Sequence, residues 1–527
     1  MNQNKTKKAS RLIGAGLCLI ALLGVCYLIA FPMRGVYNSD YADTLSWAVA
    51  SVDGGALFSS DFTYACLLPF GGQLLMMPFV ALFGFSYTAH ACGMIVFFLL
   101  FALALACFFK ALGANPFWTG ASLFCVVGAL CSSEKLREVY FGHILYYSLG
   151  GLFLMVGLTL LLSLDKDNGK KIPWWTIGFC AWCVLCSTDG LTSLTLFVLP
   201  LCAALAFERL CDKSVVFLSS ENFDRARPLF FALCFSVGGL GLGALLRHGF
   251  EAPYQEAFST FSTETDWANN LDLLLPSFLS MFTGSVTMYE PFTTFAGIAA
   301  AVRLLFALLV LVLPLVALFF WKKLSRGEKL LVIAHFTVCA TMLFAFVFGL
   351  LSNAAWRLSP MLFTSLLVSL CFIRRLCVLP FFKRFGFLLL AFCVLIAGLG
   401  LFDVAKMKPD RTPTGSAADL AAYLEQQGYT YGYSSFWNAN AITALSGDTI
   451  QCRNISVAED SGFISPDYYQ SERAWYNGQG SNESYFLLLT ENEFSYVNEA
   501  QIANNLHIDH YHGYAVIHLA DDLFPLY

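Results

Sequence analysis

The sequence has little charge. Asp, Glu, Lys and Arg make up 13% of its 527 residues, whereas 57% are apolar and 16% aromatic. Soluble globular proteins carry about twice that charged share. A chain with this many apolar residues could not bury all of their surface in one water-soluble core. We therefore expect lipid to surround most of it. The composition therefore excludes an ordinary cytosolic enzyme, a disordered chain and a nucleic-acid-binding protein.

Two other features are missing. No phosphate-binding glycine loop, metalloprotease motif or serine-hydrolase motif occurs in a context that would support it, so nucleotide-sugar chemistry is not expected. Residues 403–527 contain a single cysteine, Cys452, which excludes a disulfide within that segment.

Long apolar runs are what the chain does have. A bilayer is crossed by roughly 20 residues of helix, and the first run, after Lys8 and Arg11, has no small-residue cleavage site, so we expect a retained anchor and a cytoplasmic N-terminus. The run at 172–207 is interrupted at Ser187–Gly190, which predicts a hairpin or a broken helix. We count about eleven spans, near residues 12–32, 86–112, 117–133, 143–164, 172–187, 190–207, 229–246, 295–320, 329–352, 357–373 and 385–402.

The distribution of charge supports this order of membrane spans. Of the 26 Lys and Arg in residues 1–402, 20 fall on the side of the N-terminus, as expected of cytoplasmic loops. An odd number of spans places residues 403–527 outside, and this segment is acidic, with 16 Asp and Glu against 5 Lys and Arg. The expected fold is a polytopic all-α membrane protein with a small C-terminal extracytoplasmic α/β domain. Its parts are a transmembrane domain at 1–402, a linker at 403–414 and the α/β domain at 415–527.

Within that last domain the sequence predicts helices at 417–427, 438–445 and 498–505, and strands at 429–434, 485–489 and 511–519.

The first outer loop opens with two acids. Asp40 and Asp43 are three residues apart, so on a helix both carboxylates share a face at the outer membrane surface. Such a pair could accept a proton from a hydroxyl, orient an acceptor or hold a divalent cation such as Mg²⁺ or Mn²⁺. Asp40 could instead cap the helix that follows.

The order of these features resembles a known superfamily. A first span, an outer loop that opens on an aspartate motif, an interfacial segment ending in Pro78-x-x-x-Leu82-Phe83-Gly84 and a second span resemble the GT-C membrane glycosyltransferases, which include protein mannosyltransferases and lipid A aminoarabinose transferases. The resemblance implies sugar transfer from a polyprenyl-phosphate carrier to an acceptor outside the cytoplasmic membrane. It also implies that the first-loop acid is catalytic. By position this is Asp40, with Asp43 as the alternative, because the chain reads Asp-Tyr-Ala-Asp where many relatives have Asp-Glu or Glu-x-Asp.

A second outer loop concentrates charge at 134–138. Glu134 and Glu138 are four apart and are candidate contacts for the acceptor or a cation, and Arg137 could bind a phosphate oxygen of the carrier. A local ion pair between Glu138 and Lys135 in a solvated turn is the alternative. His143, at the start of the next span, is a weaker candidate.

Other charged residues also fall on the outer side. Arg357 could bind the carrier phosphate or reach lipid headgroups. Asp189 is a functional candidate because it interrupts an apolar stretch, although it could cap a helix at a hairpin tip. Arg247 and His248 are weaker candidates.

These observations favour an integral membrane glycosyltransferase at the outer face of the cell membrane. Its partners would be a polyprenyl-phosphate-linked sugar donor, a cell-envelope glycan, lipid or protein acceptor, and membrane lipid. A transporter or flippase of lipid-linked saccharides is the first alternative, although most spans lack the polar residues that it would need. A non-catalytic envelope assembly protein is the second.

Overall fold

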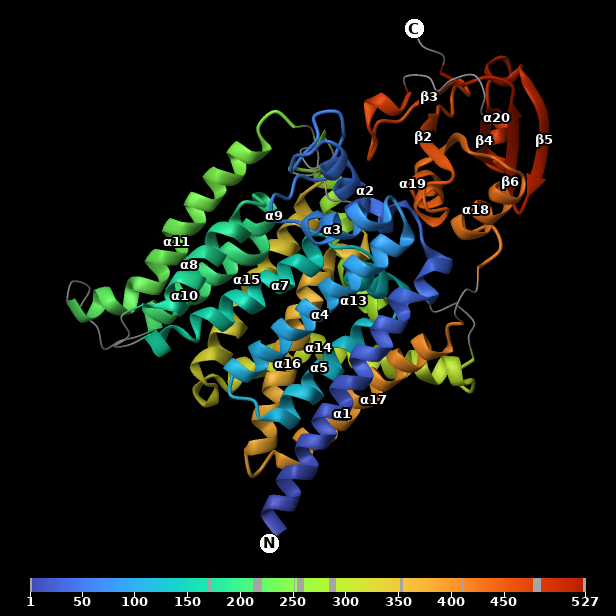
Figure 1. Cartoon of the computed structure of the whole chain (residues 1–527). Helices are drawn as coiled ribbons and strands as arrows, with labels where there is room; N and C mark the ends of the chain where they lie inside the picture. The colour runs from blue at the N-terminus through green and yellow to red at the C-terminus, as the bar shows by residue number, and fades with distance from the viewer. Residues whose placement is uncertain are drawn as a thin grey trace.

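The computed structural model describes residues 2–167, 172–211, 220–250, 252–253, 260–283, 291–350, 354–408, 412–476 and 485–524. It shows a bundle of long helices with a mixed α/β domain at one end (Figure 1). The N-terminus lies at the opposite end of the bundle.

The bundle contains every apolar segment expected from the sequence. Its elements are α1 (Asn2–Ala30), η1 (Pro32–Val36), α2 (Ser39–Asp53), α3 (Gln73–Phe83), α4 (Tyr87–Ala111), α5 (Pro116–Leu130), α6 (Glu134–Arg137), η2 (Glu138–Gly142), α7 (Tyr146–Leu161), η3 (Leu164–Asp167), α8 (Trp174–Ser187), α9 (Leu191–Ser193), η4 (Leu194–Val198), α10 (Leu199–Cys211), α11 (Ser220–Arg247), α13 (Glu264–Thr283), α14 (Phe295–Phe319), η5 (Trp321–Lys323), α15 (Arg326–Phe348), η6 (Ala355–Leu358), α16 (Ser359–Val378) and α17 (Lys383–Lys406).

The protein is a multi-pass membrane protein. In the described ranges, eight helices are long and apolar enough to cross a bilayer, and α5 with Glu134–Gly142 would add a ninth, although the two are bent by 118°. The expected spans at 143–164 and 172–187 form helices of 16 and 14 residues, shorter than a straight crossing requires. The number of about eleven crossings therefore stays a prediction.

The interrupted segment at 172–207 is a helical hairpin. Gly190 has a φ of 69°, a left-handed conformation that only glycine adopts without strain, and it separates α8 from α9. Figure 1 shows α8 and α10 running away from α9, which lies at the end of the bundle that also holds α2 and α3.

The C-terminal domain is built on a six-stranded mixed sheet in the order β3-β2-β1-β4-β6-β5. The central strand β1 is parallel to β2 and β4, and the other pairs are antiparallel. The elements are α18 (Ala417–Gln426), β1 (Tyr431–Ser435), α19 (Phe436–Leu445), β2 (Gln451–Val457), β3 (Ile464–Pro466), η7 (Arg473–Tyr476), β4 (Tyr485–Thr490), α20 (Glu491–Tyr496), η8 (Glu499–Ile502), β5 (Asn505–Tyr511) and β6 (Tyr514–Leu519).

This domain differs from expectation in two places. Strands β2 and β3 lie where no strand was predicted, and the elements after β4 are different. The predicted helix at 498–505 is only the short η8, and the predicted strand at 511–519 is β6 with the end of a preceding strand, β5. The two strands join at His512 and Gly513, which have φ values of 48° and 90°. β5 is an edge strand with half-exposed, largely polar side chains, so no alternation of apolar residues marks it in the sequence.

The two faces of the sheet belong to different cores. On β4, Phe486 and Leu488 join a core that runs through α18 and α19 into the helix bundle, whereas Leu487 and Leu489 pack on the opposite face. In Figure 1, α19 lies between the sheet and α2. The C-terminal domain therefore packs on the bundle through a shared hydrophobic core.

A buried ion-pair network joins helices at the end of the bundle nearer the N-terminus. Glu328 on α15 is 2% exposed, and its carboxylate accepts hydrogen bonds from Arg374 and Arg375 on α16. Its side chain also closes a capping box with Ser325.

We expect Glu328→Gln to lower the free energy of unfolding by about 3 kcal/mol, because it leaves two arginines without their buried counter-charge. Glu208→Gln is the matched control. It breaks a partly exposed ion pair with Arg326, and such pairs contribute up to about 1 kcal/mol. Denaturant titration in detergent measures both, and equal losses would contradict the assignment.

Candidate active site

The two acids of the first loop lie on the first turns of α2. Asn38 caps this helix, with its Oδ1 accepting from the backbone N–H of Asp40 at 3.0 Å and of Tyr41 at 3.3 Å. The alternative of Asp40 as the cap is therefore wrong, because Asn38 already fills that role. Asp40 is half-buried and Asp43 is 5% exposed.

Burial makes both carboxylates harder to ionise. It raises the pKa of Asp40 from its ordinary value, and the charge of Lys135 opposes this change. Burial raises the pKa of Asp43 further, Asp40 adds to the rise, and the side chain of Gln470 opposes it. The two acids thus share one helix but have different neighbours, a lysine for Asp40 and an amide for Asp43.

A sharp bend after α5 brings the second charged loop against α2. Ser133 caps α6 and also donates from its Oγ to the carbonyl of Met281 at 2.6 Å. The following turn, η2, is a π-helix, a form that is rare and frequent at functional sites. The ring of Tyr41 approaches Gly142 so closely that a Cβ there would lie 2.3 Å from it, so Gly142 is needed for this contact.

Of the predicted residues in this loop, Glu138 is buried and Glu134 is exposed. Burial raises the pKa of the Tyr41 hydroxyl and the charges of both acids raise it further, so a shared contact role for the two acids stays a prediction. The Nζ of Lys135 lies 2.6 Å from Glu138 Oε1, which is the ion pair considered as the alternative, but its acid is buried instead of solvated. Arg137 Nη1 donates to the carbonyl of Cys131 at 2.9 Å. Lys135, and not Arg137, is therefore the cation that affects Asp40.

His143 is fully enclosed next to this group. Burial and, to a smaller extent, Lys135 lower its pKa to about 4, so the imidazole is neutral at neutral pH. A neutral imidazole can accept or donate a hydrogen bond but adds no charge.

Arg357 is held beside the same loop by two tyrosines. Its Nη1 donates to the hydroxyl of Tyr147 at 3.0 Å and to that of Tyr146. The neighbouring Trp356 places its ring 4.5 Å below Lys135 Nζ. The η6 turn thus places Trp356 against Lys135 of α6, and the next residue of the turn is the second cation, Arg357.

Asp189, at the tip of the α8–α10 hairpin, reaches the same region. Its Oδ1 accepts from the backbone N–H of Phe70 at 2.8 Å, so it fastens the first outer loop and does not cap α9. Burial raises its pKa to about 7, opposed by this hydrogen bond and by Arg247. The thiol of Cys66 is affected by three of these charged residues. Burial raises the pKa of its thiol, the charges of Asp43 and Asp189 raise it further, and Arg357 lowers it.

The two remaining candidates, Arg247 and His248, have different environments. Arg247 lies against the hairpin tip, where a Cβ on Gly190 would be 2.3 Å from its Nη1, and its Nε donates to Gly243 of its own helix. His248 is exposed beyond the end of α11.

A divalent cation needs several oxygen or nitrogen ligands at once. Within the described ranges, no three His, Cys, Asp or Glu side chains gather closely enough to share one. The pair Asp40 and Asp43 thus has no third His, Cys, Asp or Glu beside it in those ranges, and we assign no chemical step to a metal.

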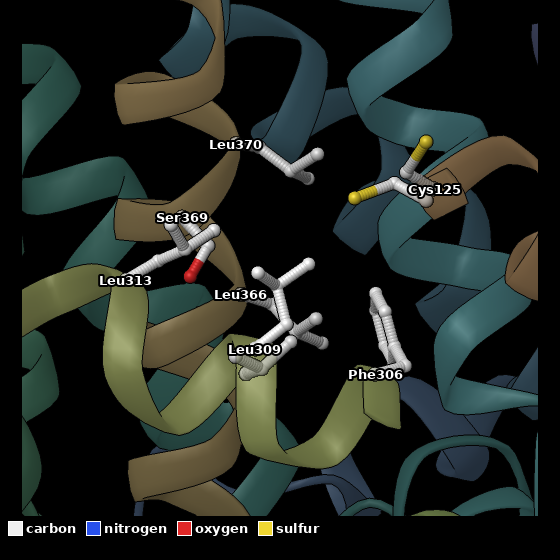
Figure 2. A pocket seen from close by; sticks show the side chains of 9 residues that line it. Cys125, Phe306, Leu309, Leu313, Leu366, Ser369 and Leu370 are labelled. Atoms are coloured by element: carbon white, nitrogen blue, oxygen red, sulfur yellow. The ribbon is translucent and has the colours of Figure 1, made fainter. Parts of the chain in front are cut away.

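An apolar pocket lies elsewhere, among α5, α14, α16 and α17 (Figure 2). Sulfur and hydrocarbon side chains line it, and Ser369 contributes the one hydroxyl. Such a lining offers no acid, base or cation, so this pocket contains no candidate for acid–base chemistry.

Sequence reasoning missed four residues of the region around α2: Lys135 as a neighbour of Asp40, the paired Tyr146 and Tyr147, and Gln470. The tyrosines directly follow the charged loop, which is a usable signal. No local pattern marks Gln470, since it lies more than 400 positions from α2.

No family model and no curated protein matches this sequence. The fold, however, is shared with solved structures. ArnT from Cupriavidus metallidurans, bound to undecaprenyl phosphate, aligns with 96% of this chain and 97% of its own, with a TM-score of 0.54 and 12% identity. The Archaeoglobus fulgidus oligosaccharyltransferase in complex with Zn and sulfate aligns with 90% of this chain and 68% of its own, with a TM-score of 0.50 and 12% identity.

Both are GT-C glycosyltransferases. The chain therefore has the GT-C fold, with helices throughout the membrane part and a small mixed-sheet domain at the C-terminus. The resemblance seen in the sequence is confirmed at this level. At 12% identity the likeness establishes the fold and leaves donor and acceptor open.

The hairpin tip yields a stability prediction. Ala at 190 would adopt a left-handed φ and displace Arg247, whereas Ala at 249 would adopt a similar φ of 87° with nothing within 4 Å. The shared backbone strain amounts to about 1–2 kcal/mol. We expect Gly190→Ala to lower the thermal unfolding midpoint only slightly more than Gly249→Ala, because the Arg247 guanidinium is the end of a flexible side chain and can move aside. A much larger loss for Gly190→Ala would show that Arg247 is held rigidly at the hairpin tip.

Proposed function

We propose that the protein is an integral membrane glycosyltransferase that moves a sugar from a polyprenyl-phosphate-linked donor to a cell-envelope acceptor. The observation that carries the proposal is the grouping of a half-buried acid, Asp40, with Lys135 and Arg357 at one end of a GT-C fold. The neighbour ArnT, which was solved with undecaprenyl phosphate bound, supports a carrier of that kind.

Asp40 is our candidate for the general base, because it is the more accessible of the two acids. Its carboxylate would accept the proton of an acceptor hydroxyl while the oxygen attacks the anomeric carbon of the sugar. The bond between that carbon and the carrier phosphate breaks, and the phosphate leaves with the electron pair. Asp43, buried one turn further along α2, would orient the acceptor or its neighbour Asp40.

Lys135 and Arg357 are our candidates for the phosphate site. Charge grows on the phosphate as it leaves, and fixed cations in a water-poor site stabilise that charge most. Tyr146 and Tyr147 hold the Arg357 guanidinium in place, so little reorganisation is needed. The phosphate role of Arg137 and the acceptor role of Glu134 stay predictions, as do roles for Glu138, His143, Asp189, Arg247 and His248.

The proposed site faces the outside of the cell. The excess of Lys and Arg on the N-terminal side supports a cytoplasmic N-terminus, and α2 and the C-terminal domain lie at the opposite end of the bundle (Figure 1). A donor in the outer leaflet would then reach Lys135 and Arg357 without crossing the membrane.

We expect Asp40→Asn to lower kcat by about 10²–10⁴-fold, the usual contribution of a general base. The assay measures undecaprenyl phosphate released in proteoliposomes from a panel of undecaprenyl-phosphate-linked sugars, with a membrane extract as the source of acceptor. Asp53→Asn is the matched control, because Asp53 is exposed at the far end of the same helix. Unchanged turnover in both Asp40→Asn and Asp43→Asn would refute the mechanism.

The same preparation separates the alternatives. Lipid-linked sugar that crosses the bilayer without release of undecaprenyl phosphate would identify a transporter, and neither activity would favour an assembly protein.

The pH profile gives a second prediction. Because the charge of Lys135 lowers the pKa of Asp40, Lys135→Met should raise that pKa and keep the base protonated to a higher pH. The acidic limb of kcat/KM should therefore move to higher pH. Lys329→Met is the matched control, since Lys329 also lies over a tryptophan ring, that of Trp321, but far from α2. An acidic limb that stays in place would exclude Asp40 as the titrating base.

A further inference from the structure

The C-terminal domain is joined to the first outer loop by backbone hydrogen bonds. Gln470 N–H donates to the carbonyl of Thr63 at 2.9 Å, Thr63 N–H donates to Ser471 at 3.2 Å, and Arg473 N–H donates to Asp61 at 2.9 Å. These bonds make residues 61–63 and the segment around Gln470 one structural unit. The C-terminal domain therefore has a fixed register relative to α2.

Both the backbone and the side chain of Gln470 are held in place. Its side chain is fully buried, and its φ of 55° lies in the left-handed region that residues other than glycine rarely adopt. Its backbone carbonyl accepts from Asn440 Nδ2 at 2.9 Å. Its side-chain Oε1 accepts from Trp47 Nε1 at 2.6 Å. With the oxygen held by Trp47, the amide nitrogen must point in another direction.

That direction is towards Asp43. Trp47 follows Asp43 by one turn, so both lie on the face of α2 that Gln470 covers. The Gln470 side chain interacts with Asp43 and lowers its pKa, against the larger rise from burial. Yet within the described part of the chain, Gln470 Nε2 and Asp43 Oδ1 form no full hydrogen bond, although both are buried. Two such atoms, a donor and an acceptor, are normally satisfied.

We propose that Gln470 is a positioning residue of the transfer site, which is anchored to Trp47 through Oε1 and orients the Asp43 carboxylate with its amide N–H groups. This inference rests on the proposed function. It makes the C-terminal domain part of the site, because that domain supplies the donor that faces an acid of α2. Substrate binding at Lys135 and Arg357 would not depend on it.

The kinetic test uses Gln470→Ala and Gln470→Glu in the full chain. We expect kcat to fall at least 10-fold and KM for the donor to change less than 2-fold in both. Glu keeps the size of the side chain and the acceptor for Trp47 but lacks the N–H donors, so it reports on positioning even if Ala unfolds the interface. Gln501→Ala is the matched control, since the Gln501 side chain bonds the backbone of Ile464 within the same domain. We expect it to keep wild-type kcat.

A double mutant shows whether Gln470 acts through Asp43. If it does, Gln470→Ala should cost nothing further in the Asp43→Asn background. Losses that multiply would overturn the proposal, because a merely structural role would persist without the carboxylate.

A measurement that does not depend on enzyme activity tests the role of Gln470 separately from the proposed function. Infrared difference spectra of wild type against Asp43→Asn isolate the carboxyl band of Asp43. In Gln470→Ala that band should titrate at a higher pH, because the donor that stabilises the ionised form is gone. A band that titrates unchanged would overturn the role of Gln470, whereas failure of every donor in the wild-type assay would overturn the proposed function alone.

Discussion

Asp40 and Asp43 lie at the end of an apolar helix bundle, where little water is available to stabilise a charge. Several neighbouring residues are placed where they compensate these two carboxylates. Asn38 caps α2, so neither carboxylate serves as the cap of the helix. The bend after α5 brings Lys135 near Asp40, and the C-terminal domain brings Gln470 near Asp43. Each acid thus has a compensating group that a distant segment supplies.

These contacts affect the carboxylates strongly because the bundle contains few other charges. In a soluble protein, a lysine near an aspartate contributes little, because water screens both. Here the charged groups of the bundle gather at its two ends. At the end nearer the N-terminus Glu328 is bonded to two arginines and closes a capping box, which is a structural arrangement. At the other end the acids remain only partly compensated, and such groups have pKa values that a reaction can use.

Much of the fold could be predicted because membrane helices are long and apolar. All the expected runs are helical, and the short α7 and α8 show where run length alone fails to establish a crossing. In the C-terminal domain the strongly apolar strand β4 was predictable, whereas β5 was not, since an edge strand with polar side chains carries no period. The site was predictable only in part. Asp40 and Asp43 stand out as a close pair of acids at the start of a loop, and Arg357 as one of the few cations on its side, and their roles stay proposals.

The sequence by itself determined that lipid surrounds most of the protein and that its membrane part is helical, because composition and run length act locally along the chain. Tertiary structure decided which charges meet. It placed Lys135 instead of Arg137 beside Asp40, turned Asp189 towards Phe70 and set Gln470 over α2. No local rule contains these pairings, since each depends on the packing of segments far apart in the chain, and in a bundle with so little charge those few pairings define the site.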